Sequence, residues 1–196
     1  MDSHSVLEQA SPWVKRFAPL IPSGEVLDLA CGGGRHSRFL AARGLSVLAV
    51  DREASALSLA AGKGIATLQC DLESDDADKS AAWPFRNGRF QGIVVTNYLH
   101  RPLFGPILNS LVPGGILIYE TFAAGNERFG KPSNPNFLLQ PGELLKIAQD
   151  AATARFHIIA FEDGYASLPK PAMVQRICLC KLDGERMPET AFNLGN

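Results

Sequence analysis

The sequence predicts a single α/β domain over residues 1–196, with a mostly parallel sheet and helices on both faces. Three observations predict this class. Short apolar runs alternate with segments whose apolar residues recur at helical spacing. Three consecutive glycines, residues 32–34, follow the first apolar run and precede an amphipathic segment. The length of 196 residues suits one domain with its own core.

The composition narrows the classes of partner. A net charge of −1 gives no global attraction to polyanions, which disfavours nucleic acid without excluding a local basic patch. The apolar runs are too short to span a bilayer, so no membrane partner is expected. The start of the sequence lacks the pattern of a signal peptide. The four cysteines lack metal-binding spacing, which predicts reduced thiols in a cytoplasmic protein and no metal site.

Residues 1–22 predict a covering helix ahead of the sheet. Trp13 and Phe17 lie on one helical face, and Ser11 followed by Pro12 is typical of a helix start. This helix packs on the sheet edge, or its two aromatic residues help to roof a ligand pocket. The sequence leaves both alternatives open.

Residues 26–37 predict a buried strand, a tight turn and the start of a helix. Glycines in such a turn let a ligand approach the main chain, and the first N–H groups of the helix then face that ligand. Gly32 and Gly34 fit the first positions of a dinucleotide-binding G-x-G-x-x-G pattern, but Ser37 holds the third. Asp28 precedes this turn, and its carboxylate would repel a pyrophosphate and attract an ammonium or sulfonium.

The next two predicted strands each end at an acidic residue. Residues 45–50 end at Asp51, whose carboxylate can accept hydrogen bonds from two ribose hydroxyls or cap the following helix. Residues 65–70 form the third strand, and Asp71 and Leu72 follow it. Both ends face the edge where open α/β sheets bind ligands.

The fourth predicted strand, residues 93–96, ends in a cluster of polar side chains. Asn97 offers a donor and an acceptor, Tyr98 is titratable, and His100 is the candidate general base because its ordinary pKa is ~6.5. These three are the candidate catalytic residues, and Arg101 is a candidate substrate contact. Alternatively, His100 binds backbone at a helix start and Arg101 is an exposed charge.

The remaining elements follow from periodicity and from turn residues. They are a helix at 103–111, a Pro-Gly-Gly break at 112–115, a strand at 116–121, a helix at 142–151, strands at 156–161 and 172–182, and a loose tail at 183–196.

Residues 122–141 are polar and too long for a tight connection. Loops of this length are commonly lids or binding loops. The candidate substrate contacts here and on the preceding strand are Glu120, Asn126, Arg128 and Phe129. The alternative is a surface loop without a role in binding.

The spacing D-x-A-x-G-x-G at residues 28–34 resembles the first motif of the class I S-adenosylmethionine-dependent methyltransferases. The L-x-P-G-G pattern at 111–115, between a helix and a strand, is a second resemblance. Residues 83–92 resemble the family's approach to its fourth strand, although Gln91 stands where Asp is usual. The resemblance covers 26–121 and looks closest to the small free-standing members of tellurite-resistance type.

This resemblance implies a seven-stranded Rossmann-like sheet with an antiparallel last strand, and S-adenosylmethionine as cofactor. In the family the glycine turn packs against the methionine portion, and the residue matching Asp28 faces its amino group. The residue matching Asp71 accepts from the adenine amine. The expected cofactor-binding residues are Asp28, Ala30, Gly32, Gly34, Asp51, Arg52, Asp71, Leu72 and Asn97.

The expected activity is methyl transfer to a small-molecule acceptor by in-line displacement. Such a reaction needs alignment and water exclusion, and it needs a base only if the nucleophile arrives protonated. A NAD(P)-dependent oxidoreductase would share Asp51 and the glycine turn, but it leaves Asp28 and residues 113–115 unexplained. A non-catalytic module that binds S-adenosylmethionine is a further alternative. The sequence does not predict the oligomeric state.

Overall fold

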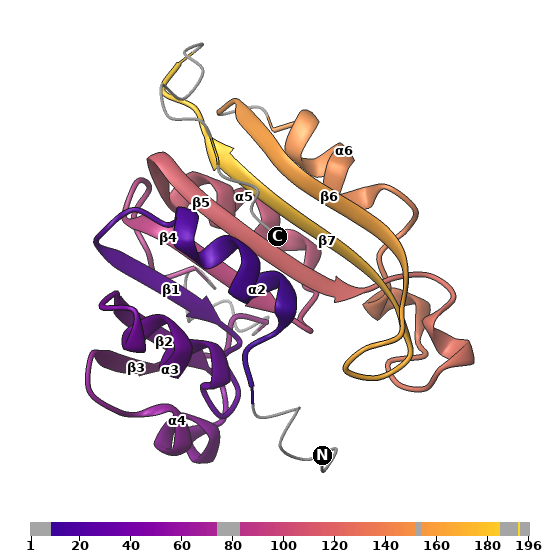
Figure 1. Ribbon diagram of the computed structural model, residues 1–196, viewed down its shortest axis with the longest axis horizontal. Helices are drawn as coiled ribbons and strands as arrows, with labels where there is room; N and C mark the ends of the chain where they lie inside the picture. Colours follow the sequence, from indigo (N-terminus) through magenta and orange to yellow (C-terminus); the bar gives the residue numbers. More distant parts are fainter. Residues whose placement is uncertain (1–8, 74–82, 152–153, 185–191, 193–196) are drawn as a thin grey trace.

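The computed structural model describes residues 9–73, 83–151, 154–184 and 192. In this part of the chain, seven strands form one sheet in the order β3-β2-β1-β4-β5-β7-β6 (Figure 1). Strands β1 to β5 are parallel to one another, whereas β7 lies antiparallel between β5 and β6. The predicted fold class is confirmed. The strands are β1 Glu25–Leu29, β2 Ser46–Asp51, β3 Ile65–Gln69, β4 Phe90–Thr96, β5 Leu111–Phe122, β6 Phe156–Ala166 and β7 Ala172–Lys181.

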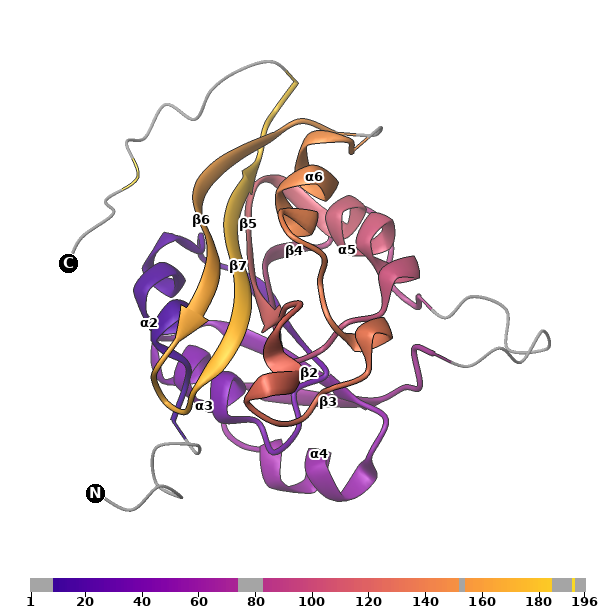
Figure 2. The same ribbon diagram turned by 90° about the vertical axis from the view of Figure 1, so that its right-hand side faces the viewer.

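Helices cover both faces of this sheet (Figure 2). The α-helices are α2 Pro12–Phe17, α3 Arg35–Ala42, α4 Ala54–Ala60, α5 Phe104–Ser110 and α6 Glu143–Gln149. Short 3-10 turns are η1 Ala18–Leu20, η2 Arg101–Leu103, η3 Asn126–Arg128 and η4 Pro135–Phe137. Within the described part of the chain, every helix is too short or too polar to cross a bilayer.

Alternation along the strands produces one apolar core on each side of the sheet. In β1, Val26 packs with α2 and α3, whereas Leu27 and Leu29 pack with α5 and α6. Asp28 follows the same alternation and points to the side of Val26. A carboxylate is therefore placed inside the core beneath the first turn of α3.

The helices α3 and α4 lie against each other at Gly34. A Cβ on this glycine would lie 2.5 Å from the Cβ of Ala60, and the φ of Gly34 is +75°. No side chain fits here without displacing backbone, so glycine is required for the approach of the two helices.

Two predicted strands and the predicted break between residues 112 and 115 differ from the structure. The strand β6 continues to Ala166, beyond the predicted end at residue 161. The strand β5 begins at Leu111, which pairs with Phe90, and a bulge at 112–115 precedes the rest of the strand. The predicted Pro-Gly-Gly break is thus an irregularity inside β5.

The predicted covering helix is short, and it packs on the sheet. Trp13 and Phe17 are buried against β5 and β7, and the Trp13 indole donates to the carbonyl of Ile177 at 3.4 Å. The alternative that these two residues roof a ligand pocket is therefore wrong. Residues 1–8 of this segment, and 185–191 and 193–196 of the predicted tail, lie outside the described residues.

Candidate active site

The candidate site lies at the carboxyl ends of β1 and β4. The chain builds the sheet outward from β1 through β2 to β3, then returns to add β4 on the other side, so a crevice opens between the two strand ends. Ala30 follows β1 with a φ of +51°, and Asn97 follows β4 with a φ of +55°. Residues other than glycine rarely adopt this conformation, and such strain concentrates at functional sites.

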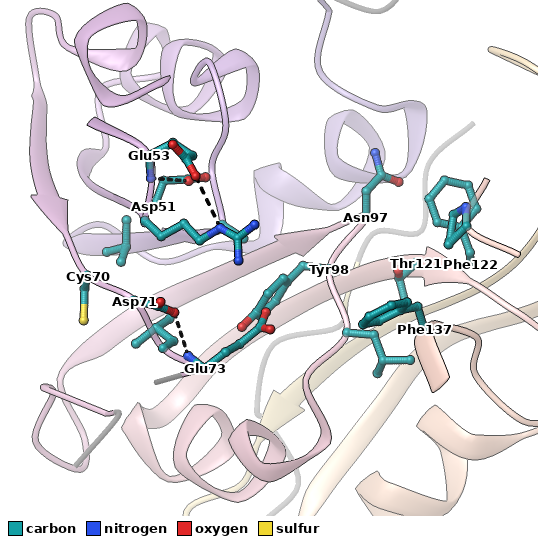
Figure 3. Close-up of a pocket in the computed structure, with 16 residues that line it drawn as sticks. Asp51, Glu53, Cys70, Asp71, Glu73, Asn97, Tyr98, Thr121, Phe122 and Phe137 are labelled. Carbon is teal, nitrogen blue, oxygen red and sulfur yellow. Dashed lines mark hydrogen bonds and ion pairs between the residues drawn. The ribbon is translucent and has the colours of Figure 1, made fainter. Parts of the chain in front are cut away.

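The first of three neighbouring cavities, here called the acidic cavity, has a volume of about 530 Å³ and lies over the ends of β2, β3 and β4 (Figure 3). Among the described residues that line it, four are carboxylates and one is a cation, Arg52. Six of the predicted cofactor-binding residues line this cavity. They are Ala30, Asp51, Arg52, Asp71, Leu72 and Asn97.

Asp51 connects this cavity to the glycine turn. One carboxylate oxygen accepts from the backbone N–H of Gly32 at 2.8 Å, and the other accepts from that of Glu53 at 3.0 Å, at the start of α4. The two roles considered for Asp51 are therefore compatible in geometry, because each carboxylate oxygen keeps a lone pair for a ligand hydroxyl.

Asp71 and Tyr98 also line the acidic cavity (Figure 3). Asp71 accepts from the backbone N–H of Glu73 at 3.0 Å. Burial, together with the charge and hydrogen bond of Glu73, raises the pKa of Tyr98 well above its usual value. The phenol therefore stays protonated at neutral pH, and it can donate a hydrogen bond but cannot serve as a base.

The second cavity, here called the turn cavity, has a volume of about 560 Å³ and lies over the glycine turn. A Cβ on Gly32 would meet no atom within 4 Å, and the φ of this residue is +52°. The main chain at Gly32 is therefore open to a ligand, whereas Gly34 serves the packing of α3 on α4. Arg35 lines both this cavity and the third cavity.

Asp28 lies beneath this turn, and it does not line the three cavities. Its side chain is 1% exposed, and its carboxylate accepts from the Ser37 hydroxyl at 2.5 Å. Burial raises the pKa of Asp28 to about 6, an effect that the Ser37 hydrogen bonds and the charge of Arg35 oppose. Its proposed interaction with a cofactor amine stays a prediction.

His36 was not singled out from the sequence, yet it links three elements of the site. The backbone N–H of Ser11 donates to Nε2 of His36 at 3.2 Å, so Nε2 carries no proton. Nδ1 is then protonated and faces the Thr96 hydroxyl at 3.3 Å. Burial lowers the pKa of His36 to about 3, with a further contribution from Arg35. A neutral imidazole thus joins the start of α2 to α3 and the end of β4.

The third cavity, here called the basic cavity, has a volume of about 420 Å³ and lies between the start of α2, the end of β5 and the β6–β7 connection. Glu120, a predicted substrate contact, lines it and forms an ion pair with Arg176 at 2.5 Å. Asn97 and Phe122 line both this cavity and the acidic cavity. The two cavities therefore meet at the ends of β4 and β5.

Residues 122–141 border the site, but the side chains that line it are not the predicted substrate contacts. Phe122, Pro132 and Phe137 line the acidic cavity. The ends of the segment are joined, because Leu139 donates its N–H to the carbonyl of Phe122 at 3.0 Å. The sequence carries no periodic signal for these positions, since their direction depends on the 3-10 turns η3 and η4.

The three substrate contacts predicted within this segment lie away from the cavities. Asn126 is buried, and its side chain accepts from the Met173 N–H at 3.2 Å and donates to the Pro132 carbonyl at 3.0 Å. Phe129 packs against Tyr165 with ring centroids 5.2 Å apart, and Arg128 lies over the Phe129 ring. In this structure Asn126 and Phe129 hold the segment to the β6–β7 hairpin, whereas Arg128 contacts residues of its own turn.

Arg101 and His100 are likewise outside the cavities. Arg101 forms an ion pair with Glu143 at 2.7 Å and donates to the carbonyls of Asn136 and Leu138 at 2.8 and 3.0 Å. It thereby anchors the 122–141 segment to α6. The carbonyl of His100 accepts from a helical N–H in η2, and the geometry does not bring the His100 side chain to a cavity.

Comparison with known proteins shows what the chain is similar to. Residues 26–115 match the family described as methyltransferase domain. The match covers slightly less than half of the chain. It includes the glycine turn, Asp51, Asp71 and Asn97, and all of the predicted cofactor-binding residues lie inside it.

Two curated relatives that carry the methyltransferase name match part of the chain. YqeM of Bacillus subtilis is 28% identical over 131 residues, which cover 62% of this chain and 51% of that protein. Protein-L-isoaspartate O-methyltransferase of Chlorobaculum tepidum is 30% identical over 108 residues, covering 55% of this chain and 49% of that one. The chain therefore spans about half the length of the curated relatives that it matches.

The fold of the chain is also that of solved structures. TehB of Haemophilus influenzae superposes with a TM-score of 0.68 at 19% identity, over 88% of this chain and 62% of that chain. A S-adenosylmethionine-dependent methyltransferase of Mesorhizobium loti superposes with a TM-score of 0.65 at 18% identity, over 89% and 99% of the two chains. The predicted resemblance to methyltransferases is confirmed by the family match and the two curated relatives, and these structures show the shared fold.

Proposed function

We propose that this protein transfers a methyl group from S-adenosylmethionine to a small-molecule acceptor. The observation that carries the proposal is the Asp51 carboxylate, which bridges the glycine turn and the acidic cavity within the residues that match a methyltransferase family. A carboxylate at this place can accept hydrogen bonds from both ribose hydroxyls of an adenosyl group.

The residues present fit this cofactor. Asp51 would hold the ribose, Asp71 would accept from the adenine amine, and the open main chain at Gly32 would lie against the methionine portion. The Arg35 guanidinium is placed to pair with the methionine carboxylate, because it lines the turn cavity. Four carboxylates around the acidic cavity would repel the pyrophosphate of NAD(P), which disfavours the oxidoreductase alternative.

The residues at the junction of the cavities would align the reaction. When bound, the cofactor supplies an electrophilic methyl group on a positively charged sulfur. A lone pair of the acceptor forms the new bond to the methyl carbon while the electrons of the carbon–sulfur bond stay on sulfur. Asn97, which borders all three cavities, can orient either reactant through its amide, and Phe122 excludes water from the same point.

Calorimetry on the Asp51→Ala variant tests the cofactor site. Loss of a charged acceptor should weaken the binding of S-adenosylhomocysteine by about 1.5–3 kcal/mol, or about 10- to 150-fold in Kd. Asp150→Ala, which removes an exposed carboxylate just after α6, is the matched control and should bind normally. An unchanged Kd in Asp51→Ala would refute the ribose role.

Two further measurements separate the alternatives. NADH should give no thermal shift in the wild-type protein, and a shift would favour the oxidoreductase. Incubation with S-adenosylmethionine and a metabolite extract should release S-adenosylhomocysteine. Tight binding without any release would favour the non-catalytic module.

A further inference from the structure

We propose that the basic cavity binds the methyl acceptor, and that this acceptor carries an anionic group, a carboxylate or a phosphate, on an apolar body. The inference rests on the proposed function, because it names the substrate class of the same site. The position, the charge and the walls of the cavity support this inference.

The position of the basic cavity suits the second reactant. It meets the acidic cavity at Asn97 and Phe122, and it meets the turn cavity at Arg35 and Asn97. A methyl group held at this junction would face the basic cavity, while the adenosyl group would occupy the acidic cavity on the other side. An acceptor in the basic cavity can therefore approach the methyl carbon from the side opposite the cofactor's sulfur, as in-line displacement requires.

The charge of the cavity favours an anion. Four cations line it, Lys15, Arg35, Lys170 and Arg176, against the single carboxylate of Glu120 among the described residues. The chain as a whole has a net charge of −1, so this excess is local. Complementary potential of this kind selects partners of opposite charge and rejects those of like charge.

Two of the four cations are available to a ligand. Arg176 is already paired with Glu120 at 2.5 Å and with Glu162 at 3.1 Å. Lys15 donates only to the neutral amide of Gln9, at 2.9 Å, and Lys170 has no carboxylate within 4.0 Å among the residues that the structure describes. Both ammonium groups therefore keep donors for an anionic group at the rim.

The remaining walls of the cavity are mostly apolar. Pro12 of α2, Phe122 of β5, Val174 of β7 and Leu168 of the β6–β7 connection contribute to them. Leu168 is 73% exposed, which is unusual for a large aliphatic residue beside a cavity. An apolar body of the acceptor would cover Leu168, while its anionic group reaches Lys15 and Lys170.

The test measures binding to protein saturated with S-adenosylhomocysteine. The probes are octanoate, octyl phosphate and octylammonium, which share one apolar chain and differ in charge. Calorimetry should show that an anionic probe binds at least about tenfold more tightly than octylammonium. Comparison of octanoate with octyl phosphate identifies the preferred anion.

Variants locate the binding of these probes. The double variant Lys15→Gln/Lys170→Gln should bind the anionic probe at least about fivefold more weakly, while its affinity for S-adenosylhomocysteine stays within about twofold. Lys63→Gln removes an exposed lysine that lies outside the three cavities, and it should bind both ligands as the wild type does.

The outcomes separate this inference from the proposed function. If neither anionic probe binds, if octylammonium binds as tightly, or if the double variant keeps full affinity, the anionic acceptor is refuted while the cofactor site stands. If the wild-type protein does not bind S-adenosylhomocysteine, the proposed function itself fails.

Discussion

Asp28 is a carboxylate in the middle of a central strand, with a hydroxyl of α3 as its hydrogen-bond donor. The sequence motif predicts the residue type, and strand alternation explains why it points beneath α3. Its burial and its bond to Ser37 could not be predicted, because both depend on how closely α3 lies on β1. The raised pKa follows from that burial.

The pH dependence of cofactor binding tests the role of Asp28. Its pKa of about 6 means that the carboxyl is neutral at low pH and ionised at pH 7.5. Only the ionised form attracts the ammonium of S-adenosylhomocysteine, so the affinity should rise as pH increases through about 6, on the order of tenfold. Calorimetry between about pH 5 and 8 measures this rise.

Asp28→Asn should remove the rise, because the amide stays neutral at every pH. Asp150→Asn, at the surface just after α6, should keep the wild-type profile. Parallel profiles for Asp28→Asn and the wild type would show that the Asp28 charge does not act on the ligand.

At the scale of elements, Arg101 joins residues 122–141 to α6. The sequence placed Arg101 at the correct sheet edge, but a charge beside a predicted cleft does not reveal whether its partner is a ligand or another segment. The ion pair with Glu143 and the bonds to the Asn136 and Leu138 carbonyls show that it holds the segment carrying Phe137.

Arg101→Met should therefore loosen this segment. Loss of three anchoring contacts should speed amide hydrogen exchange at Leu138 and Leu139, while the affinity for S-adenosylhomocysteine stays within about threefold. Hydrogen exchange followed by mass spectrometry checks this, with Arg128→Met as the control that bonds only within its own turn. If Arg101→Met lost activity while its hydrogen exchange stayed unchanged, the result would support Arg101 as a substrate contact instead.

A second element-scale contact closes the carboxyl end of α5. The Lys181 ammonium donates to the carbonyls of Leu108, Asn109 and Leu111 at 3.3, 3.1 and 2.7 Å. These carbonyls lack partners inside the helix, and a cation is also favoured by the helix dipole at this end. Burial lowers the pKa of Lys181, and the three carbonyls are the acceptors that its ammonium finds at this buried place.

Lys181→Met should lower the free energy of unfolding by about 1–3 kcal/mol, because it keeps the apolar stem and removes the hydrogen bonds. Urea unfolding measures the loss. Lys146→Met, which removes an exposed ion pair with Asp150, should cost less than about 0.5 kcal/mol. Equal effects of the two substitutions would contradict the capping role.

At the scale of the whole molecule, the sheet was predictable because its central strands are continuous apolar runs beside turn residues. The edge of the sheet was harder to predict. Glu162 and Asp163 of the edge strand β6 are polar, and they interrupt the apolar pattern from which the strand was predicted. The basic cavity was not predictable at all. Lys15 and Lys170 come from opposite ends of the chain, and only the completed sheet brings them to one cavity.

The buried imidazole of His36 should govern part of the stability of the whole molecule at acid pH. Its pKa is lowered to about 3, whereas an unfolded histidine has a pKa of ~6.5. The unfolded state therefore binds the proton first, and the free energy of unfolding falls as pH drops below about 6.5, by up to ~1.4 kcal/mol per pH unit.

The free energy of unfolding of His36→Gln should fall less on acidification than that of the wild type, because glutamine does not titrate. Urea unfolding at about pH 7 and 4.5 measures the difference. His157→Gln, on strand β6, is the control and should lose stability on acidification as the wild type does. Asp28 acts in the opposite direction in both proteins, so it cancels in the comparison. Equal loss in His36→Gln and wild type would contradict the neutral imidazole.

The contact between Gly34 and Ala60 has a consequence for how proteins of this shape diversify. It holds α3 against α4 beside the glycine turn, in a block that tolerates little change. The basic cavity is walled instead by a short amino-terminal helix, a hairpin connection and the end of β5. Grafting the first two of these parts from a relative should transfer the choice of methyl acceptor while leaving the block that holds the donor intact.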